Sequence, residues 1–232
     1  MRYLLSAIAL LGAMGASSVM AQDNKVVVEL YTSQGCSSCP PADALLHDLA
    51  KRPDVIALAL HVDYWDYLGW KDDFAKAAFT KRQHGYAQAS NATTVYTPQM
   101  VIGGKDHVIG SKAMDVMDHI VAQRAATDRV AIDLTRNGGN VQINAVAKSA
   151  NLGDMVVQLV RYTPEETVAI RRGENAGKTL RYSNIVTSWS TVGQWDGKTP
   201  LAVSAAASGS DPVVVIIQNR RFGPIIAAAE LR

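Results

Sequence analysis

The hydrophobic and polar positions of the first half of the chain follow two different periods. Residues 25–31 and 55–62 are nearly continuous apolar runs rich in β-branched side chains. Such runs are typical of strands buried on both faces of a parallel or mixed sheet. Between them, residues 42–51 carry apolar side chains at helical spacing, and Pro53 ends the segment. The pattern predicts a β-α-β unit.

The same kind of patterning continues to about residue 127. Residues 72–89 predict a polar helix, and the apolar segments 100–104 and 107–109 predict a hairpin. Ser111 is placed to cap a final helix. The order β-α-β-α-β-β-α predicts a central mixed sheet flanked by helices.

From residue 129 onward the pattern changes to a period of two. Residues 130–134 and 141–145 alternate around the turn 137–140, which is a strong hairpin signal. Further strand candidates are residues 155–162, 167–171, 180–186, 201–205, 213–217 and 225–230. This spacing predicts an all-β, sandwich-like C-terminal domain over residues 129–232, after a first domain over residues 22–128.

The first 21 residues have a pattern of their own. Arg2 precedes a short apolar core, and the segment ends on Ala21, as a secretory signal peptide does. The apolar stretch is shorter than the ~20 residues that a spanning helix needs. We therefore expect cleavage after Ala21, no membrane span in the mature chain, and a periplasmic or extracellular protein.

Composition and charge mainly argue against particular kinds of partner and cofactor. The chain of 232 residues is 48% hydrophobic and 19% charged, which is ordinary for a globular protein. A formal net charge of +2 gives no indication of a nucleic-acid partner. With two cysteines and five histidines that lack paired ligand spacing, the sequence predicts no metal site and no other cofactor.

The two cysteines, Cys36 and Cys39, lie between the first predicted strand and the first predicted helix. A helix that opens with Cys-x-x-Cys after a strand is typical of a redox centre, because the helix N-terminus favours a thiolate. We expect Cys36 to be the attacking thiol and Cys39 the resolving thiol. A structural disulfide is less favoured, since linking residues three apart stabilises a chain little.

The element order and a proline in front of the third strand resemble the thioredoxin fold. In that fold the position of Pro98 carries a cis-proline whose loop lies against the cysteines. More narrowly, residues 29–43, with Gly-Cys-Ser-Ser-Cys-Pro-Pro-Ala-Asp within them, resemble the signature of a secreted, thioredoxin-like bacterial family filed under a domain of unknown function. The resemblance implies an α/β thioredoxin-like first half, with Pro98 in the catalytic site and Tyr96 and Thr97 holding an extended substrate.

Three further features have competing interpretations. Glu29 lies in the first strand, where burial would raise its pKa, and the thioredoxin resemblance implies a proton shuttle for Cys39. The alternative is a carboxylate that faces solvent or a lysine. For the charged loop 171–177 a plain turn is favoured over a segment that reaches the cysteines. For the aromatic segment 61–70, packing is favoured over a wall beside them.

The sequence thus predicts a secreted thiol–disulfide oxidoreductase that acts on protein or small-molecule thiols with an unidentified redox partner. A redox-inactive binding module is one alternative. A copper-handling protein is another, with Cys36, Cys39 and Met100 or a histidine as ligands. A peroxidase using Cys36 is the least favoured. The intervening Ser37 and Ser38 add no charge, which argues against an extreme oxidant.

Overall fold

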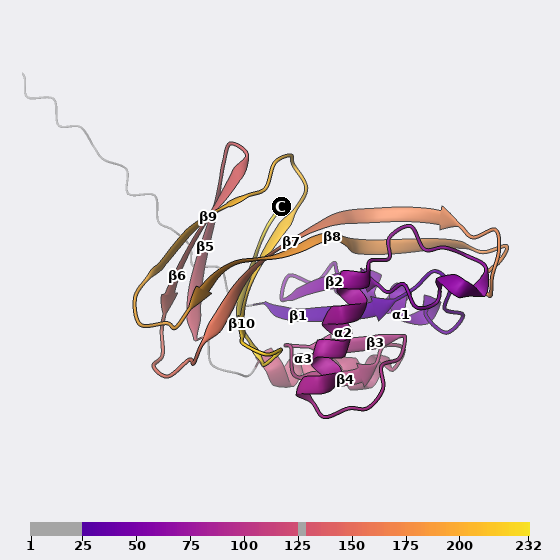
Figure 1. The fold of residues 1–232 in the computed structure, drawn as a ribbon, viewed down its shortest axis with the longest axis horizontal. Helices are drawn as coiled ribbons and strands as arrows, with labels where there is room; N and C mark the ends of the chain where they lie inside the picture. Colours follow the sequence, from indigo (N-terminus) through magenta and orange to yellow (C-terminus); the bar gives the residue numbers. More distant parts are fainter. Residues whose placement is uncertain (1–24, 125–128) are drawn as a thin grey trace, which may run out of the picture.

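The structure is a computed structural model that describes residues 25–124 and 129–232 (Figure 1). The predicted signal peptide, residues 1–21, and the predicted domain boundary at residue 128 lie outside the described residues. The elements of the first half are β1 (Val26–Thr32), α1 (Pro40–Leu49), β2 (Val55–His61), the 3-10 helix η1 (Asp66–Leu68), α2 (Ala77–Ala89), β3 (Gln99–Ile102), β4 (Asp106–Ile109) and α3 (Ala113–Arg124).

The second half consists of strands in the part that the structure describes. They are β5 (Val130–Asn137), β6 (Asn140–Ala147), β7 (Met155–Ala169), β8 (Thr179–Trp195), β9 (Leu201–Ala206), β10 (Val213–Asn219) and β11 (Ile225–Leu231). Strands β5, β6 and β9 form an antiparallel sheet of their own, in the order β5-β6-β9. The predicted hairpin of residues 130–145 is therefore confirmed.

One eight-stranded sheet carries the rest, in the order β11-β10-β7-β8-β2-β1-β3-β4. The pairs β1–β2 and β2–β8 are parallel and the others are antiparallel, so the predicted large mixed sheet is confirmed. Strand β8 joins β2 where Ile185 lies opposite Ala59. This pairing covers two strand edges that would otherwise be open. The two halves consequently share one sheet.

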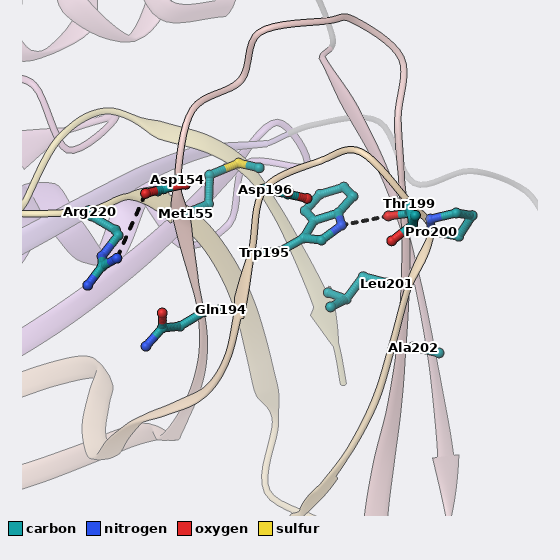
Figure 2. Close-up of a pocket in the computed structure, with 10 residues that line it drawn as sticks. All are labelled: Asp154, Met155, Gln194, Trp195, Asp196, Thr199, Pro200, Leu201, Ala202 and Arg220. Atoms are coloured by element: carbon teal, nitrogen blue, oxygen red, sulfur yellow. Dashed lines mark hydrogen bonds and ion pairs between the residues drawn. The ribbon is translucent and has the colours of Figure 1, made fainter.

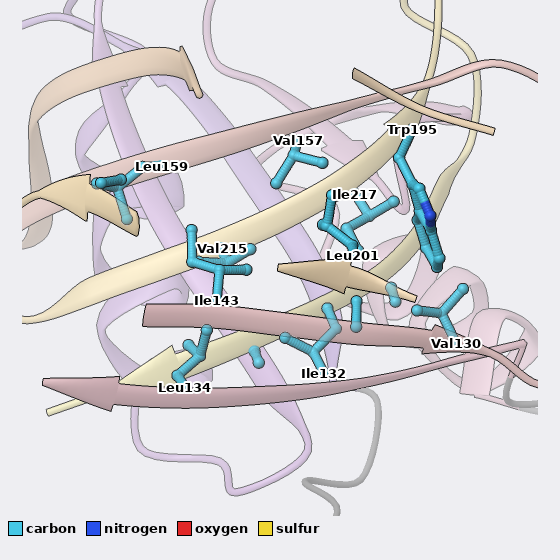
Figure 3. Close-up of a cluster of buried hydrophobic side chains, with 14 of the residues drawn as sticks. Val130, Ile132, Leu134, Ile143, Val157, Leu159, Trp195, Leu201, Val215 and Ile217 are labelled. Atoms are coloured by element: carbon cyan, nitrogen blue, oxygen red, sulfur yellow. The ribbon is translucent and has the colours of Figure 1, made fainter. Parts of the chain in front are cut away.

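Three apolar cores hold these layers together. On one face of β1 and β2 lie α1 and α3, around Leu30, Leu46 and Ile120. On the opposite face lies α2, which contributes Phe79 and Tyr86. The third core lies in the second half, where side chains of β5 and β6 meet those of β7, β10 and β11 (Figure 3). This face-to-face contact of two sheets gives the second half its sandwich-like character.

Two predicted boundaries are wrong. The helix predicted from residue 72 begins at Ala77, because Asp72 is buried and its carboxylate accepts the backbone N–H groups of Phe74 and of Gln34, in the turn after β1. The strands predicted at 155–162 and 167–171 are one strand, β7, whose pairing with β8 continues on both sides of Pro164. The cross-strand pairing on both sides of Pro164 thus overrides the preference of proline for the end of a strand. The long β7–β8 hairpin therefore reaches along the sheet toward the segment after β2 (Figure 1).

Candidate active site

Cys36 and Cys39 lie in the turn between β1 and α1 and form a disulfide. Cys39 is the N-cap residue of α1, and its carbonyl oxygen accepts hydrogen bonds from the N–H groups of Ala42 and Asp43. Because the first N–H groups of a helix lack intrahelical acceptors, a thiolate in this turn would be stabilised. Cys36 is 4% exposed and Cys39 is 0% exposed, so Cys36 is the more exposed of the two cysteines.

The loop in front of β3 contacts the cysteines. The Thr97–Pro98 peptide bond is cis, as predicted. The Thr97 hydroxyl donates a hydrogen bond to Cys36 Sγ over 3.2 Å, and Trp65 Nε1 donates to Thr97 Oγ1 over 2.7 Å. Pro98 is buried, whereas Tyr96 is 37% exposed. The structure thus brings Thr97 and Pro98 to the cysteine turn and leaves Tyr96 open to solvent.

The aromatic segment after β2 lines the same turn. A Cβ atom at Gly35 would lie 3.2 Å from the carbonyl oxygen of Trp65, so this segment runs close to the backbone before Cys36. Trp70 Nε1 donates to Gln34 Oε1 over 2.7 Å. The ring of Tyr67, which is 77% exposed, stacks on Trp65 with centroids 6.4 Å apart. The sequence favoured packing over a wall beside the cysteines for residues 61–70. In the structure the segment packs and also lies against the cysteine turn.

The loop between β7 and β8 also reaches the cysteines, so the interpretation as a plain turn is wrong. The side-chain amide of Asn175 donates to the carbonyl oxygens of Gln34 and Cys36, each over 2.9 Å. The Glu174 carboxylate accepts the backbone N–H of Ser37 over 3.3 Å. Neither contact has a local sequence signal, because 137 or more residues separate the partners.

Glu29 lies elsewhere than its predicted role requires. Its carboxylate accepts two hydrogen bonds from the Arg82 guanidinium, over 2.7 and 2.8 Å, and one each from the hydroxyls of Tyr31 and Tyr86. These four donors fill the acceptor capacity of a carboxylate. Arg82 comes from α2, on the face of the sheet opposite α1. Glu29 therefore anchors α2 to β1, and we do not assign it proton transfer with Cys39.

A different set of buried polar groups lies beneath the cysteine turn. Thr32 and His61 end β1 and β2 opposite each other, and the Thr32 hydroxyl donates to Asp43 Oδ1 over 2.8 Å. His61 Nδ1 donates to Asp72 Oδ2 over 2.7 Å. The ring of Tyr182, from β8, lies edge to face with the His61 ring at 4.9 Å. All five side chains are at least 95% buried.

Three atoms of this cluster have no hydrogen-bond partner among the described residues: Asp43 Oδ2, His61 Nε2 and the Tyr182 hydroxyl. Burial raises the pKa of Asp43 to about 7, although His61 and the Thr32 hydroxyl act in the opposite direction. Burial, together with the Asp43 and Asp72 carboxylates, also raises the pKa of Tyr182. Unsatisfied buried groups cost stability, and such clusters are common at functional sites. Sequence reasoning missed this cluster, although Asp43 comes one helical turn after Cys39.

A separate hollow of about 500 Å³ lies in the second half (Figure 2). It is lined by Asp154, Met155, Gln194, Trp195, Asp196, Thr199, Pro200, Leu201, Ala202 and Arg220. Met155 begins β7 and Trp195 ends β8, so the hollow lies at the opposite end of the hairpin from Glu174 and Asn175. It takes no part in the cysteine site.

The described residues contain neither a group of side chains typical of a metal site nor a helix suited to span a membrane. Within residues 25–124 and 129–232, no three His, Cys, Asp or Glu side chains gather as a metal site requires. None of the helices in those ranges is both long enough and apolar enough to cross a membrane.

Comparisons with known proteins give a family and a fold. The model of the family described as "Protein of unknown function (DUF1223)" matches residues 27–218. A crystal structure of a protein from Agrobacterium tumefaciens, from a structural genomics consortium, is 36% identical with a TM-score of 0.77, over 90% of this chain and 94% of that chain. HBP35 of Porphyromonas gingivalis is similar in fold, with a TM-score of 0.59 and 13% identity over 90% of this chain and 75% of that chain. No curated protein sequence matches the chain.

Proposed function

We propose that this chain, which belongs to the DUF1223 family of proteins of unknown function, is a thiol–disulfide oxidoreductase working through Cys36 and Cys39. The observation that carries the proposal is the hydrogen bond from the Thr97 hydroxyl to Cys36 Sγ, at a disulfide that precedes the N-terminus of α1. A purely structural disulfide needs neither a helix N-terminus nor a hydroxyl donor at its sulfur. Both features stabilise a Cys36 thiolate.

The proposal includes a thioredoxin-like fold for the first half and a location outside the cytoplasm. The β1-α1-β2 unit, the cis-proline loop before β3 and the closing helix α3 support the fold assignment. The signal-peptide pattern ending at Ala21 supports secretion. In an oxidising compartment a Cys-x-x-Cys pair can cycle between the disulfide and the dithiol.

In the reductive direction the Cys36 thiolate attacks one sulfur of a substrate disulfide. The substrate disulfide breaks, its other sulfur leaves as a thiolate, and Cys36 is joined to the substrate in a mixed disulfide. Cys39 then attacks Cys36 Sγ, which releases the second substrate thiolate and forms the Cys36–Cys39 disulfide. The substrate has gained two electrons and the protein has lost two. An external dithiol, or two external thiols, returns them and becomes a disulfide, and the same steps in reverse oxidise a substrate.

The second step requires removal of the Cys39 thiol proton inside the protein. Asp43 is suited to accept it, because it lies one turn from Cys39 on α1, is buried, and has a carboxylate oxygen without a hydrogen-bond partner among the described residues. With its pKa raised to about 7, Asp43 can take up and release a proton near neutrality. We therefore assign to Asp43 the proton transfer that the sequence predicts for Glu29.

A redox titration of the folded protein tests the proposed function. The protein is equilibrated in glutathione buffers of graded potential, alkylated, and analysed by mass for Cys36 and Cys39. We expect one reversible two-electron transition, reached faster than the same pair equilibrates in urea, because the folded site activates Cys36. A pair that stays oxidised throughout the series while folded, and is reduced only after unfolding, would overturn the proposal in favour of a structural disulfide.

A further inference from the structure

The tip of the β7–β8 hairpin is not needed by the exchange steps themselves, yet it makes a specific set of contacts with the cysteine turn. Asn175 is 0% exposed, and its amide nitrogen donates to two carbonyl oxygens, those of Gln34 and Cys36. Lys178 Nζ donates to Asn175 Oδ1 over 2.9 Å. Because the lysine is a donor and the two carbonyls are acceptors, one orientation of the amide satisfies all three bonds. Asn175 thus fixes the backbone on both sides of Gly35.

Glu174, next to Asn175, brings a negative charge to the same turn. Its carboxylate accepts the N–H of Ser37, which is bonded directly to the carbonyl carbon of Cys36. The hydrogen bond holds the negative carboxylate at the residue directly after Cys36. That charge repels a thiolate on Cys36 and so opposes the stabilisation from α1 and from Thr97.

We propose that the β7–β8 tip is a control element of the cysteine site, in which Asn175 positions the turn and Glu174 restrains Cys36 as a nucleophile. The inference rests on the proposed oxidoreductase function and adds to it a role for the second half of the chain. It also gives the site a preference for positively charged substrates. The Glu174 carboxylate attracts a cationic disulfide and repels an anionic one, so removing the carboxylate should reduce the advantage of the cationic disulfide. Arg171 and Arg172, exposed on the same loop, act equally with and without Glu174.

The test compares Glu174→Gln with Glu166→Gln, since both substitutions remove one exposed carboxylate from the same hairpin. Glutamine keeps an acceptor oxygen for the Ser37 N–H and removes only the charge. The reduced full chain is alkylated with iodoacetamide over a range of pH, and the modification of Cys36 is followed by mass. We expect Glu174→Gln to lower the pKa of Cys36 by about half a unit to one unit. Alkylation well below that pKa then becomes about three to ten times faster.

Three expected results support the proposal, and either of two contrary results would overturn it. The shift should be absent in Glu166→Gln and should shrink in 1 M salt, where charges are screened within about 3 Å. The rate ratio between an anionic disulfide, oxidised glutathione, and a cationic one, cystamine, should rise severalfold in Glu174→Gln alone. Identical alkylation profiles for the wild type and Glu174→Gln would overturn the proposal, as would an equal shift in both variants.

Asn175→Ala separates positioning from charge. Loss of both amide bonds loosens the turn and uncovers Cys36, so alkylation should become faster at every pH with little change in its pKa. An unchanged rate in a variant that keeps the wild-type circular dichroism would contradict the positioning role. Alkylation reads the thiol directly, so these results remain decisive even if the glutathione titration finds a pair that does not exchange.

Discussion

Asp43→Asn is expected to slow the resolving step about a hundredfold near neutral pH and, at the same time, to stabilise the protein. The rate falls because asparagine cannot accept the Cys39 proton, and positioned proton transfer commonly contributes at least this factor. Stopped-flow measurement with an aromatic disulfide reagent that releases a coloured thiolate reports the two steps in turn: the attack by Cys36 and the resolution by Cys39. Only the second step should slow.

The pH dependence of the resolution rate also tests whether Asp43 accepts the Cys39 proton. In the wild type the resolution rate should rise with pH through about 7, where Asp43 becomes ionised, and then level off. Asp43→Asn should lose this transition and keep only the ionisation of the thiols. Asp48→Asn, an exposed change on the same helix, serves as the control and should leave both steps unaltered. A wild-type resolution rate and pH profile in Asp43→Asn would remove Asp43 from the mechanism.

The stability effect has a definite sign. The carboxyl of Asp43 ordinarily titrates at 3.8 and in the folded protein at about 7, so the folded state binds the extra proton between these values. Stability is therefore lost as pH rises through this window, by at most about 4 kcal/mol above pH 7. In urea unfolding, the free energy of unfolding of Asp43→Asn relative to the wild type should increase by about 3 kcal/mol between pH 5 and pH 8. A group kept at such a cost is best explained by function.

Arg82→Met is expected to destabilise the protein by about 3–5 kcal/mol, the largest stability loss among these predictions. The substitution leaves the fully buried Glu29 carboxylate without its cation. It also removes bonds to Gln158 of β7 and Gln218 of β10, and the stacking on Trp189 of β8, whose ring centroid lies 3.7 Å from the guanidinium carbon. Arg82 thus joins the first half to three strands of the second.

Denaturant unfolding of two control variants makes this prediction specific. Arg181→Met breaks an exposed ion pair with Glu165 on the β7–β8 hairpin and should change the free energy of unfolding far less than Arg82→Met does, because solvent screens exposed ion pairs. Adding Glu29→Leu to Arg82→Met removes the stranded charge and should recover part of the loss. If Arg82→Met cost no more than Arg181→Met, the buried pair would not be what joins the two halves.

Much of the local structure was predictable because it depends on neighbouring residues. Strand β1, the turn with Cys36 and Cys39, helix α1 and the hairpin β5–β6 follow from periodicity, from prolines at a helix start and from an Asn-Gly turn. The resemblance to the thioredoxin fold also predicted that the loop of Pro98 lies against the cysteines. These features lie in short stretches where backbone preference and burial agree.

The amino-acid sequence alone is therefore enough to predict the cysteine pair at the start of α1 and the strands and helices around it. Which groups surround that pair depends on how distant segments pack together. It turned Glu29 toward Arg82, placed Asp43 under the turn with His61 and Tyr182, and brought Glu174 over it. The physical reason is that local periodicity fixes which face of an element is buried, whereas the partner of a buried charge comes from whichever distant segment packs against that face.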